Sequence, residues 1–469
     1  MLDHRLIQIV PSPHQKALQE MEFYAFVHFT VNTFTDREWG DGSESPAVFN
    51  PEKLDADQWV QAIKAAGMKG LILTCKHHDG FCLWPSKHTA HSVAASPWKN
   101  GQGDVVAEVS AACRRAGIRF GVYLSPWDRH EKCYGTGKEY DDYFVAQLTE
   151  LMTNYGDIFC AWFDGACGEG PNGKKQVYDW PRYYEVIRRL QPGATIHICG
   201  PDVRWCGNEA GDTREAEWSV VPLRTQDTEK IKENSQQSDD ESFRQRRISA
   251  SDQDLGSREI LANEPDLVWY PAEVDTSIRP SWFWHASEDD KVRPLEKLID
   301  IYEKSVGGNA TLLLNIPPTS EGLFHQHDVA RLQQFGQYLA DCYGDNLAAS
   351  AAVTASPAAP GHDIGCALTA DESYYLPAQE NVPAEITLAW PEEITFRRIV
   401  LQEQISQSQR VERYAIDALV NGQWREIAAG RVIGHKRIVV LEKTAAQAIR
   451  IRIEDARVAP TIRFIGVYA

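Results

Sequence analysis

Apolar runs and amphipathic segments alternate along residues 23–344. The apolar runs are nearly continuous, which is typical of strands in a parallel sheet that helices cover on both faces. The pattern predicts strands at 23–29, 69–78, 118–126, 157–165, 194–200, 266–275 and 310–318, and helices at 55–68, 104–117, 140–156, 180–193, 294–308 and 327–344. Repeated strand–helix units of this number favour a (β/α)8-like barrel over an open sheet.

The pattern changes twice along the chain. Residues 221–258 are polar and highly charged, and we expect a long surface excursion there. Near 345–360 the residues become small and include proline, which indicates a domain boundary without structure of its own. We therefore predict two domains, an α/β barrel over 1–347 and an all-β sandwich over 348–469. The strands of the second domain are expected at 385–390, 396–404, 413–420, 436–442 and 448–455.

Residues with reactive side chains lie where the predicted strands end. In a barrel the carboxyl ends of all strands meet on one rim, and barrel enzymes have their active sites there. Taken singly, each residue also has a structural explanation; Asp164 before Gly165, for example, is equally typical of a helix cap or an Asx turn. The convergence is therefore the informative observation. The residues concerned are His28, His77, His78, Tyr123, Trp127, Asp164, Arg204, Glu209, Trp282 and Trp284.

Two of these residues, Asp164 and Glu209, are carboxylates, and such a pair among histidines and aromatic rings suits glycoside hydrolysis. One carboxylate attacks the anomeric carbon and stabilises the positive charge that develops in the sugar ring. The other is kept protonated by burial or by nearby negative charge, and it protonates the departing oxygen. Trp162 lies two residues before Asp164 and shares its face of the strand.

The net charge of the chain argues against two classes of binding partner. It carries 48 Lys and Arg against 66 Asp and Glu, a formal net charge of −18. Nucleic acid and anionic membranes need a basic face, so we expect neither as a partner. No apolar stretch approaches the roughly 20 residues that a membrane span requires. The 14 Trp and 17 Tyr residues fit a sugar-binding cleft, although large cores use the same residues.

The cysteines and the N-terminal residues indicate the cellular compartment to expect. The ten cysteines form no CxxC motif and no disulfide-like spacing. We expect the cysteines in apolar strand or helix patterns (Cys75, Cys113, Cys160 and Cys199) and those beside Asp164 and Glu209 (Cys167 and Cys206) to pack as small apolar side chains. The first residues show no signal-peptide pattern. We therefore expect a cytoplasmic protein, or a periplasmic or secreted one if a leader has been removed.

Two other functions fit parts of the pattern. A metal-dependent barrel hydrolase would use His77, His78 and Asp79, but adjacent histidines are awkward ligands for one ion, and no HxH or HExxH spacing occurs. A non-catalytic carbohydrate-binding protein is the other alternative, and it has no need of a matched pair of carboxylates. We expect neither a metal nor a cofactor.

Six motifs lie along the barrel part of the chain: HHDGFCLWPS at 77–86, YLSPWD at 123–128, WFDGACG at 162–168, VRWCGNEAG at 203–211, RPSWFWH at 279–285 and LLLNIPP at 312–318. As a set, they resemble glycoside hydrolase family 29, the α-L-fucosidases, over residues 20–345. The resemblance implies a barrel enzyme that releases fucose with retention of configuration through a covalent fucosyl–Asp intermediate. It implies that Asp164 is the nucleophile and Glu209 the acid/base.

The same resemblance implies the residues that bind the sugar. Glu38 would bind a fucose hydroxyl, an assignment for which Glu44 is the alternative. The other implied substrate-binding residues are His28, Trp39, His77, His78, Tyr123, Trp127, Trp162, Arg204 and Trp282.

Two further parts of the chain carry finer resemblances. Residues 38–59 and the GNEAG motif resemble the branch of the family that prefers α-1,3/1,4-linked fucose in branched, Lewis-type oligosaccharides and glycans; a broad or α-1,2 preference is the alternative. Residues 398–438 resemble a galactose-binding-like, discoidin-type β-sandwich, which we expect to give structural support with at most weak sugar binding. The expected partner is a fucosylated oligosaccharide.

Overall fold

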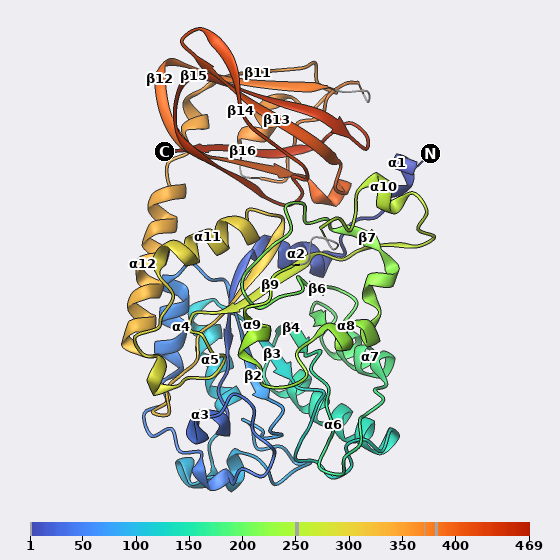
Figure 1. Cartoon of the computed structure of the whole chain (residues 1–469), viewed down its shortest axis with the longest axis vertical. Helices are drawn as coiled ribbons and strands as arrows, with labels where there is room; N and C mark the ends of the chain where they lie inside the picture. The colour runs from blue at the N-terminus through green and yellow to red at the C-terminus, as the bar shows by residue number, and fades with distance from the viewer. Residues whose placement is uncertain (1, 249–252, 370, 380–382) are drawn as a thin grey trace.

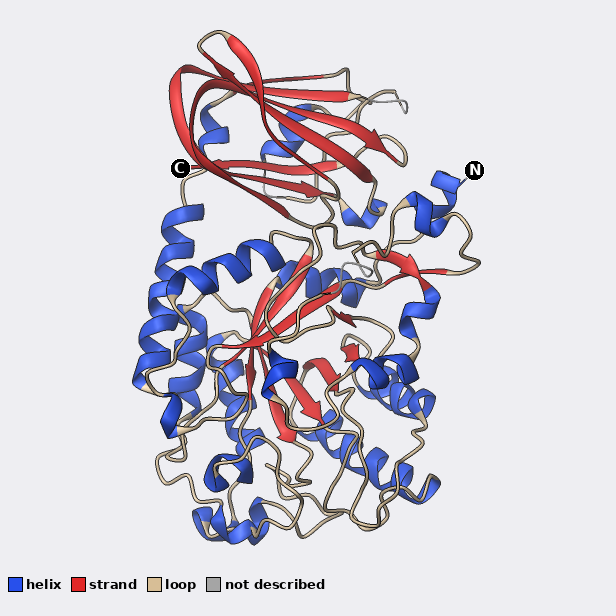
Figure 2. Ribbon diagram, in the orientation of Figure 1, coloured by secondary structure: helices blue, strands red, loops and turns tan. Residues whose placement is uncertain are grey.

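The computed structural model describes all residues except 1, 249–252, 370 and 380–382, and it consists of two domains (Figure 1). A barrel of parallel strands surrounded by helices forms the larger domain. A mostly β domain follows it in the chain and lies at one end of it (Figure 2). This architecture confirms the predicted fold class, a (β/α)8-like barrel followed by an all-β domain.

Eight parallel strands form the barrel sheet, in the order β5-β4-β3-β2-β1-β10-β9-β6. Almost every residue in these strands is buried, as the continuous apolar runs predict for a sheet with both faces covered. The strands are β1 (Phe23–Val27), β2 (Gly70–Lys76), β3 (Arg119–Leu124), β4 (Ile158–Phe163), β5 (Thr195–Ile198), β6 (Arg204–Trp205), β9 (Ala272–Ser277) and β10 (Ala310–Asn315).

The sheet nearly closes on itself between β5 and β6. His197 and Val203 form a parallel bridge there, and the amide of Ile198 donates to the carbonyl oxygen of Val203 at 3.0 Å. No helix separates these two strands. Ile198 adopts a left-handed backbone conformation with φ of 65°, which is strained for a β-branched residue. The tight connection therefore stores strain at the carboxyl end of the barrel.

The long helices of this domain cover the outer face of the sheet. Three of them begin where an aspartate precedes the apolar pattern, because Asp55, Asp104 and Asp179 each accept a hydrogen bond from the third helical amide. Within the described residues, no helix combines the length and the apolarity that crossing a bilayer requires. The covering helices are α4 (Ala56–Ala65), α5 (Val105–Ala116), α6 (Lys138–Asn154), α7 (Trp180–Leu190), α11 (Leu295–Ser305) and α12 (Gln326–Tyr343).

Short N-terminal helices leave only one end of the barrel open. α1 (Leu2–Leu6) and α2 (Pro13–Met21) precede β1, and the single-turn α3 (Val31–Thr35) follows it. Leu18 and Met21 of α2 pack with Phe159 inside the barrel, and Met21 also contacts Arg119 at the start of β3. α2 therefore covers the amino ends of the strands and leaves the carboxyl ends for a site.

A long insertion, residues 206–271, separates β6 from β9. It contains the antiparallel pair β7 (Val220–Pro222) and β8 (Leu267–Trp269), with the short helices α8 (Thr228–Asn234), α9 (Glu241–Arg244) and α10 (Arg258–Leu261). The expectation of a surface excursion at 221–258 is wrong in part, because Ser235 and Gln236 are buried against the open end of the barrel. Residues 249–252 of that segment lie outside the described part of the chain.

The C-terminal domain is an antiparallel β structure in two layers. β12 and β15 are long strands that bend at bulges, such as that between Ala389 and Ile394, so that their two halves pair with different neighbours. One half of β12 pairs with β11, and the other half pairs with β16. The strands are β11 (Ala352–Ala355), β12 (Ala384–Glu403), β13 (Val411–Val420), β14 (Gln423–Gly430), β15 (Arg437–Ala456) and β16 (Ile462–Tyr468). β11 lies inside 345–360, so the expectation of a boundary without structure is wrong there.

Charged pairs join the two domains. Glu22, just before β1, accepts from Lys436 Nζ at 2.6 Å and from His435 Nε2 at 3.1 Å. Burial favours the neutral form of Glu22, but the Lys436 ammonium and the His435 hydrogen bond outweigh it and hold the pKa of Glu22 below its ordinary value. Arg398 of β12 pairs with Glu303 of α11 in the same way. The interface therefore contributes to stability through ions that are largely removed from water.

We predict that Lys436→Met lowers the free energy of unfolding by about 1–3 kcal/mol at neutral pH, because it leaves a mostly buried carboxylate without its cation. Urea denaturation of the whole chain measures this change. Because the pKa of Glu22 is depressed in the folded state, the loss should be complete above the ordinary glutamate pKa of about 4.3 and should shrink as pH falls below it.

Lys443→Met is the matched control, since Lys443 is exposed in the same domain. It should leave the unfolding free energy within about 0.5 kcal/mol of the parent. Equal effects of the two substitutions would contradict a specific role of the Glu22 pair.

Candidate functional site

A pocket with about 530 Å³ of empty space lies at the carboxyl end of the barrel, where the strand ends converge. Its walls are mainly aromatic and carboxylic, and the residues come from nearly every strand end of the barrel and from the insertion. The lining residues are Phe26, His28, Trp39, His77, His78, Tyr123, Trp162, Asp164, Ala166, Ile198, Trp205, Glu209, Ser235, Gln236, Asp275 and Trp282.

Asp164 is the first residue after β4, and its carboxylate faces this pocket. Tyr123 Oη donates to its Oδ2 at 2.9 Å, and the amide of Ala166 donates to its Oδ1 at 2.8 Å. Burial raises the pKa of Asp164, and these two donors counteract that rise. A side chain at Gly165 would collide with Ser235 Oγ, so the glycine allows the insertion to approach the carboxylate. The hydrogen bond from the Ala166 amide is that of an Asx turn, and no helix begins among these described residues, so the helix-cap explanation is wrong and the Asx turn is present beside a carboxylate that faces the pocket.

Glu209 lies in the loop after β6 and faces the same pocket. Trp282 Nε1 donates to its Oε2 at 2.9 Å, and Thr276 Oγ1 holds its backbone carbonyl at 2.8 Å. Burial raises the pKa of Glu209 to about 7, and the negative charge of Asp164 adds to the rise. Asp164 has two donors that favour its charged form and Glu209 has one, so the two carboxyl groups lie in different electrostatic environments.

Three buried histidines line the wall between β1 and β3. Burial lowers the pKa of His28 to about 3 and those of His77 and His78 well below the ordinary value. His28 Nδ1 donates to Asn315 Oδ1 at 2.8 Å, because the amide nitrogen of Asn315 is spent on two other acceptors. Its Nε2 is therefore left as an acceptor in the neutral ring.

His78 is oriented in the same manner. Its Nδ1 lies 2.7 Å from Ser125 Oγ, whose own proton goes to the carbonyl oxygen of Trp127 at 2.6 Å. Its Nε2 lies 3.8 Å from Asp164 Oδ2. Neutral imidazoles fixed in this way accept hydrogen bonds from hydroxyl groups and leave the charge of Asp164 uncompensated.

The pocket contains a third carboxyl group, Asp275, that sequence reasoning missed. Asp275 lies in β9, and its Oδ1 accepts from Trp205 Nε1 at 2.8 Å. Burial raises the pKa of Asp275 well above its ordinary value, and the nearby Glu209 and Glu273 raise it further. The sequence signal for this residue was present, because a carboxylate inside an otherwise buried strand at 266–275 requires an explanation.

Glu38 lies just outside the pocket lining. Its carboxylate accepts from the amides of Trp282 and Phe283, both at 2.8 Å, and from His285 Nε2 at 3.0 Å. It thereby fixes the loop that carries Trp282. Glu44, the alternative, is spent on the amides of its own loop and on Arg37, so Glu38 is the nearer of the two to the pocket.

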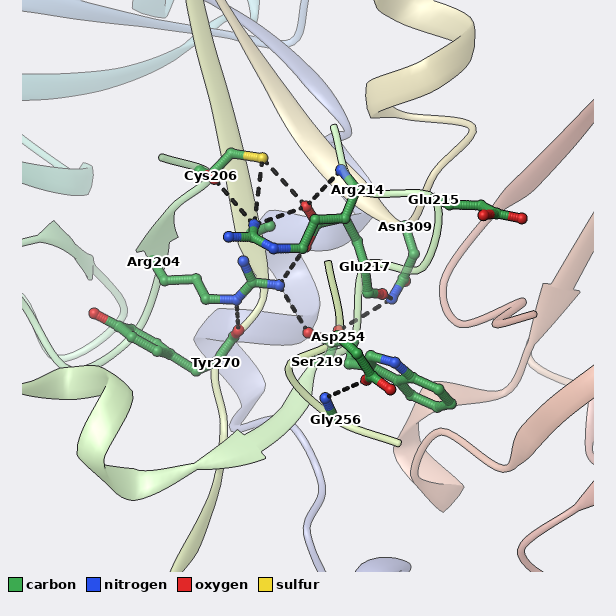
Figure 3. A network of polar contacts seen from close by, with 12 residues as sticks. Arg204, Cys206, Arg214, Glu215, Glu217, Ser219, Asp254, Gly256, Tyr270 and Asn309 are labelled. Atoms are coloured by element: carbon green, nitrogen blue, oxygen red, sulfur yellow. Dashed lines mark hydrogen bonds and ion pairs between the residues drawn. The ribbon is translucent and has the colours of Figure 1, made fainter. Parts of the chain in front are cut away.

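The structure does not bring Arg204 to the pocket. Arg204 is the first residue of β6, and alternate strand residues face opposite sides, so its neighbour Trp205 lines the pocket instead. Figure 3 shows Arg204 in a buried network, where Nη2 pairs with Glu217 Oε2 at 2.6 Å and Nε donates to the carbonyl oxygen of Tyr270 at 3.1 Å. Arg214 pairs with the other oxygen of Glu217 at 3.1 Å. Arg204 stabilises the insertion from behind the pocket.

Trp162 and Trp127 contribute to the site in different ways. Trp162 forms part of the pocket wall, and its Nε1 donates to Glu273 Oε1 at 2.7 Å. Trp127 lies behind the lining residues, where it packs on His78 and Trp39 and its Nε1 donates to the carbonyl oxygen of Glu169. Its effect on the pocket is therefore through the orientation of these two rings.

The residues considered for a metal do not gather around one point. The carboxylate of Asp79 is directed to Thr30 Oγ1 and to the amide of Phe81, at 2.8 and 2.7 Å, rather than toward the two histidines. Throughout the described parts of the chain, no three His, Cys, Asp or Glu side chains cluster as metal ligands.

A second pocket, the side pocket, opens beside the first and shares Glu209 and Trp282 with it. It encloses about 660 Å³ of empty space. Its walls come from α9 and from the loop between β9 and α11. The lining residues are Glu209, Glu241, Arg244, Gln245, Ser277, Pro280, Trp282, Lys291 and Arg293.

Known proteins resemble this chain over nearly its whole length. The family model described as alpha-L-fucosidase matches residues 13–344. Alpha-L-fucosidase 1 of Arabidopsis thaliana is 38% identical over 468 residues, which cover 98% of this chain and 87% of that protein. A solved structure of a glycoside hydrolase 29 family member from an unknown rumen bacterium has a TM-score of 0.81 at 37% identity, covering 98% of this chain and 77% of its own. A Ruminococcus gnavus glycoside hydrolase 29 fucosidase in complex with fucose has a TM-score of 0.84 at 31% identity, covering 98% and 95%.

The hydrogen bond from Trp282 to Glu209 allows a direct test of what sets the pKa of Glu209. Trp282 Nε1 donates to the ionised form of Glu209, so Trp282→Phe should raise the pKa of Glu209 from about 7 by about one further unit. Infrared difference spectroscopy across a pH titration measures this pKa, with Glu209→Gln as the blank that identifies its band. Trp284→Phe, which removes a donor to Asp289 instead, is the control and should leave the titration in place. A fall in the Glu209 pKa of the Trp282 variant would contradict the assignment.

Proposed function

Because the chain belongs to the α-L-fucosidase family, glycoside hydrolase family 29, we propose that it is a retaining exo-acting enzyme that releases terminal α-1,3- or α-1,4-linked L-fucose from branched, Lewis-type oligosaccharides. The observation that carries the proposal is the pair Asp164 and Glu209, which face one pocket in different electrostatic environments. Membership of the family supports the α-L-fucosidase activity. The role of each residue and the linkage preference are our proposals.

The first step is attack by Asp164 on the anomeric carbon of fucose. The carboxylate is held by donors on both of its oxygens, so its orientation costs little reorganisation. As the new C–O bond forms, the glycosidic C–O bond breaks, and protonated Glu209 gives its proton to the departing oxygen. The products of this step are a fucosyl–Asp164 ester, the free aglycone and the Glu209 carboxylate.

The second step returns both carboxyl groups to their starting states. Esterification removes the negative charge of Asp164, which had helped to keep Glu209 protonated. Glu209 is therefore more acidic in the intermediate and is ready to act as a base. It takes a proton from water as the water oxygen attacks the anomeric carbon, and the ester bond to Asp164 breaks. Two inversions give net retention.

The remaining lining residues fit recognition of one sugar ring. The neutral rings of His28 and His78 present acceptor nitrogens, and Phe26, Trp162 and Trp282 offer flat apolar faces for the apolar side of a fucose ring. The strand ends enclose the pocket on several sides, which supports removal of a terminal sugar rather than cleavage within a chain.

The side pocket supports the linkage. It adjoins Glu209, which protonates the departing oxygen, so the aglycone leaves through it. It lies beside the pocket for fucose, which provides space outside that pocket for an aglycone that presents two sugars at a branch point. Residues 38–59 include Glu38, which holds the Trp282 loop between the two pockets.

The C-terminal domain is proposed to be a galactose-binding-like, discoidin-type domain that supports the barrel. Its contacts with the barrel domain favour this role: Gln409 accepts from the amide of Ser219 at 2.8 Å, and Arg258 pairs with Asp455 at 2.8 Å. Both contacts fix the insertion that covers the pocket.

A proton NMR time course tests the proposed reaction. The substrate is a trisaccharide that carries fucose 1,3- or 1,4-linked beside a galactose, and we expect the α-anomer of fucose to appear first. The β-anomer first would mean inversion, in which case Asp164 would act as a base rather than a nucleophile. Release only from a 1,2-linked or aryl fucoside would keep the chemistry and overturn the linkage.

Two substitutions separate the roles of the carboxyl groups. Asp164→Ala should lose nearly all turnover on every substrate, and retention of more than about a tenth of the rate would remove Asp164 from the nucleophile role. Glu209→Ala should slow substrates with sugar leaving groups by about 10²- to 10⁴-fold and slow activated aryl fucosides much less. Equal losses on both would argue against an acid. Glu442→Ala, an exposed carboxylate of the C-terminal domain, is the control, and thermal unfolding confirms that each variant is folded.

A further inference from the structure

We propose that the side pocket is a subsite for an anionic group, so that the preferred aglycones carry a carboxylate or a sulfate ester next to the fucosylated sugar. This inference rests on the proposed function, because it concerns the part of the substrate that leaves on the Glu209 side. It predicts the charge of the aglycone, which the contacts of the fucose pocket do not determine.

Cations without acidic partners line this pocket. Lys291 is exposed and forms no ion pair with any carboxylate in the described residues. Arg293 is half-buried, and its guanidinium donates only to neutral oxygens, the carbonyl of Ser277 at 2.6 Å and Thr276 Oγ1 at 3.1 Å. Among described side chains it too has no carboxylate partner. Burial lowers the pKa of Arg293, as expected where no anion offsets the lost hydration.

The third cation, Arg244, is anchored rather than free. Its Nη1 lies 3.0 Å from Asp239 Oδ1 and 3.9 Å from Glu38 Oε2. It therefore orients the wall of the pocket nearest Glu209. Two acidic side chains, Glu209 and Glu241, line the same pocket. Glu241 is exposed, and the hydrogen bond that its Oε1 accepts from Gln245 Nε2 is long at 3.5 Å.

The surroundings make these cations unusual. The chain has a formal net charge of −18, and most of its other basic side chains in the described residues form ion pairs with acids, as Lys76, Arg188 and Arg279 do. In such a chain an anionic substrate is repelled over most of the surface, and a local positive site directs it to one place. Neutral sugar hydroxyls would hydrogen-bond to the same groups, but a half-buried guanidinium without a counterion gains most from a charged acceptor.

The position of the subsite limits where the charge sits on the substrate. Glu209 and Trp282 line both pockets, so the glycosidic oxygen lies between them. Lys291 and Arg293 line the side pocket from the loop that leads from β9 to α11. The anionic group would thus belong to the sugar that carries fucose or to its immediate neighbour, as the carboxylate of an acidic sugar or as a sulfate ester.

A pair of aryl fucosides tests the subsite independently of linkage. We compare kcat/KM for the 3-carboxyphenyl and the 3-carbamoylphenyl α-L-fucosides, which match in shape and differ in charge. The carboxylate should be favoured by about three- to fivefold at low salt, the range of a partly exposed ion pair, and the preference should largely vanish in about half-molar sodium chloride. The readout is a ratio within one enzyme sample, so differences in folded fraction cancel.

Lys291→Gln should reduce the ratio by about twofold or more. Lys304→Gln is the matched control, because it removes one positive charge from the exposed face of α11, outside the side pocket, and it should leave the ratio unchanged. Arg293→Lys keeps the charge and should retain the preference, whereas Arg293→Gln should reduce it.

Natural aglycones identify the source of the charge. The same fucosylated trisaccharide is offered in three forms: neutral, with a sialic acid on its galactose, and with a 6-sulfate on its galactose. A higher kcat/KM for the sialylated form assigns the subsite to a sugar carboxylate, and a higher value for the sulfated form assigns it to a sulfate ester.

The outcomes separate this inference from the proposed function. If both aryl fucosides are hydrolysed with a ratio at or below one that neither salt nor Lys291→Gln changes, the anionic subsite is wrong and the fucosidase stands. If the folded protein hydrolyses neither the aryl fucosides nor the neutral fucosylated trisaccharide, the proposed function is wrong, and the subsite falls with it.

Discussion

The site depends on one buried carboxylate that crosses the interior of the barrel. Glu273 of β9 is fully buried, and its Oε1 accepts from Trp162 Nε1 at 2.7 Å while its Oε2 accepts from Tyr24 Oη and from His197 Nδ1 at 2.8 Å. Burial disfavours its charge, but these donors outweigh burial and lower the pKa of Glu273. An unsatisfied carboxylate at this depth would cost several kcal/mol. The barrel therefore has one arrangement of β1, β4, β5 and β9 that satisfies it, and that arrangement places Trp162 in the pocket wall two residues before Asp164.

Alternate side chains of β9 extend these polar contacts toward the open, carboxyl end of the barrel. Glu273, Asp275 and Ser277 share one face of the strand. They bind, in turn, the indole of Trp162, the indole of Trp205, and the amide of Asn315 that orients His28; both indoles are part of the pocket wall. The three side chains follow one another toward the carboxyl end of the strand. The strand thus connects the buried ion to the end of the barrel where Asp164 and Glu209 face the pocket.

Much of the fold and of the candidate site could be predicted from the sequence. The parts that could not be predicted have physical explanations. The continuous apolar runs predicted the barrel strands, and convergence of strand ends predicted that Asp164, Glu209 and the histidines meet. Arg204 was expected at the sugar because it follows a strand, but β6 is only two residues long, so no periodicity shows which of its side chains faces inward. Ser235 and Gln236 lie in a charged segment whose local pattern contains no signal of burial. They are buried because Gly165 leaves room for them, a contact between residues about 70 positions apart that no local rule encodes.

The placement of the acid also depends on the second domain, through a series of direct contacts. The amide of His435 donates to Asn309 Oδ1 at 2.7 Å, and Asn309 Nδ2 donates to the backbone carbonyl of Glu217 at 2.7 Å. Glu217 in turn binds Arg214, whose Nη1 holds the carbonyl of Cys206 at 3.0 Å, three residues before Glu209. Burial raises the cost of charge at Glu217, yet the two arginines hold its pKa at about 2. These contacts connect the C-terminal domain to the loop that carries Glu209, so a domain outside the pocket can influence where the proposed acid lies.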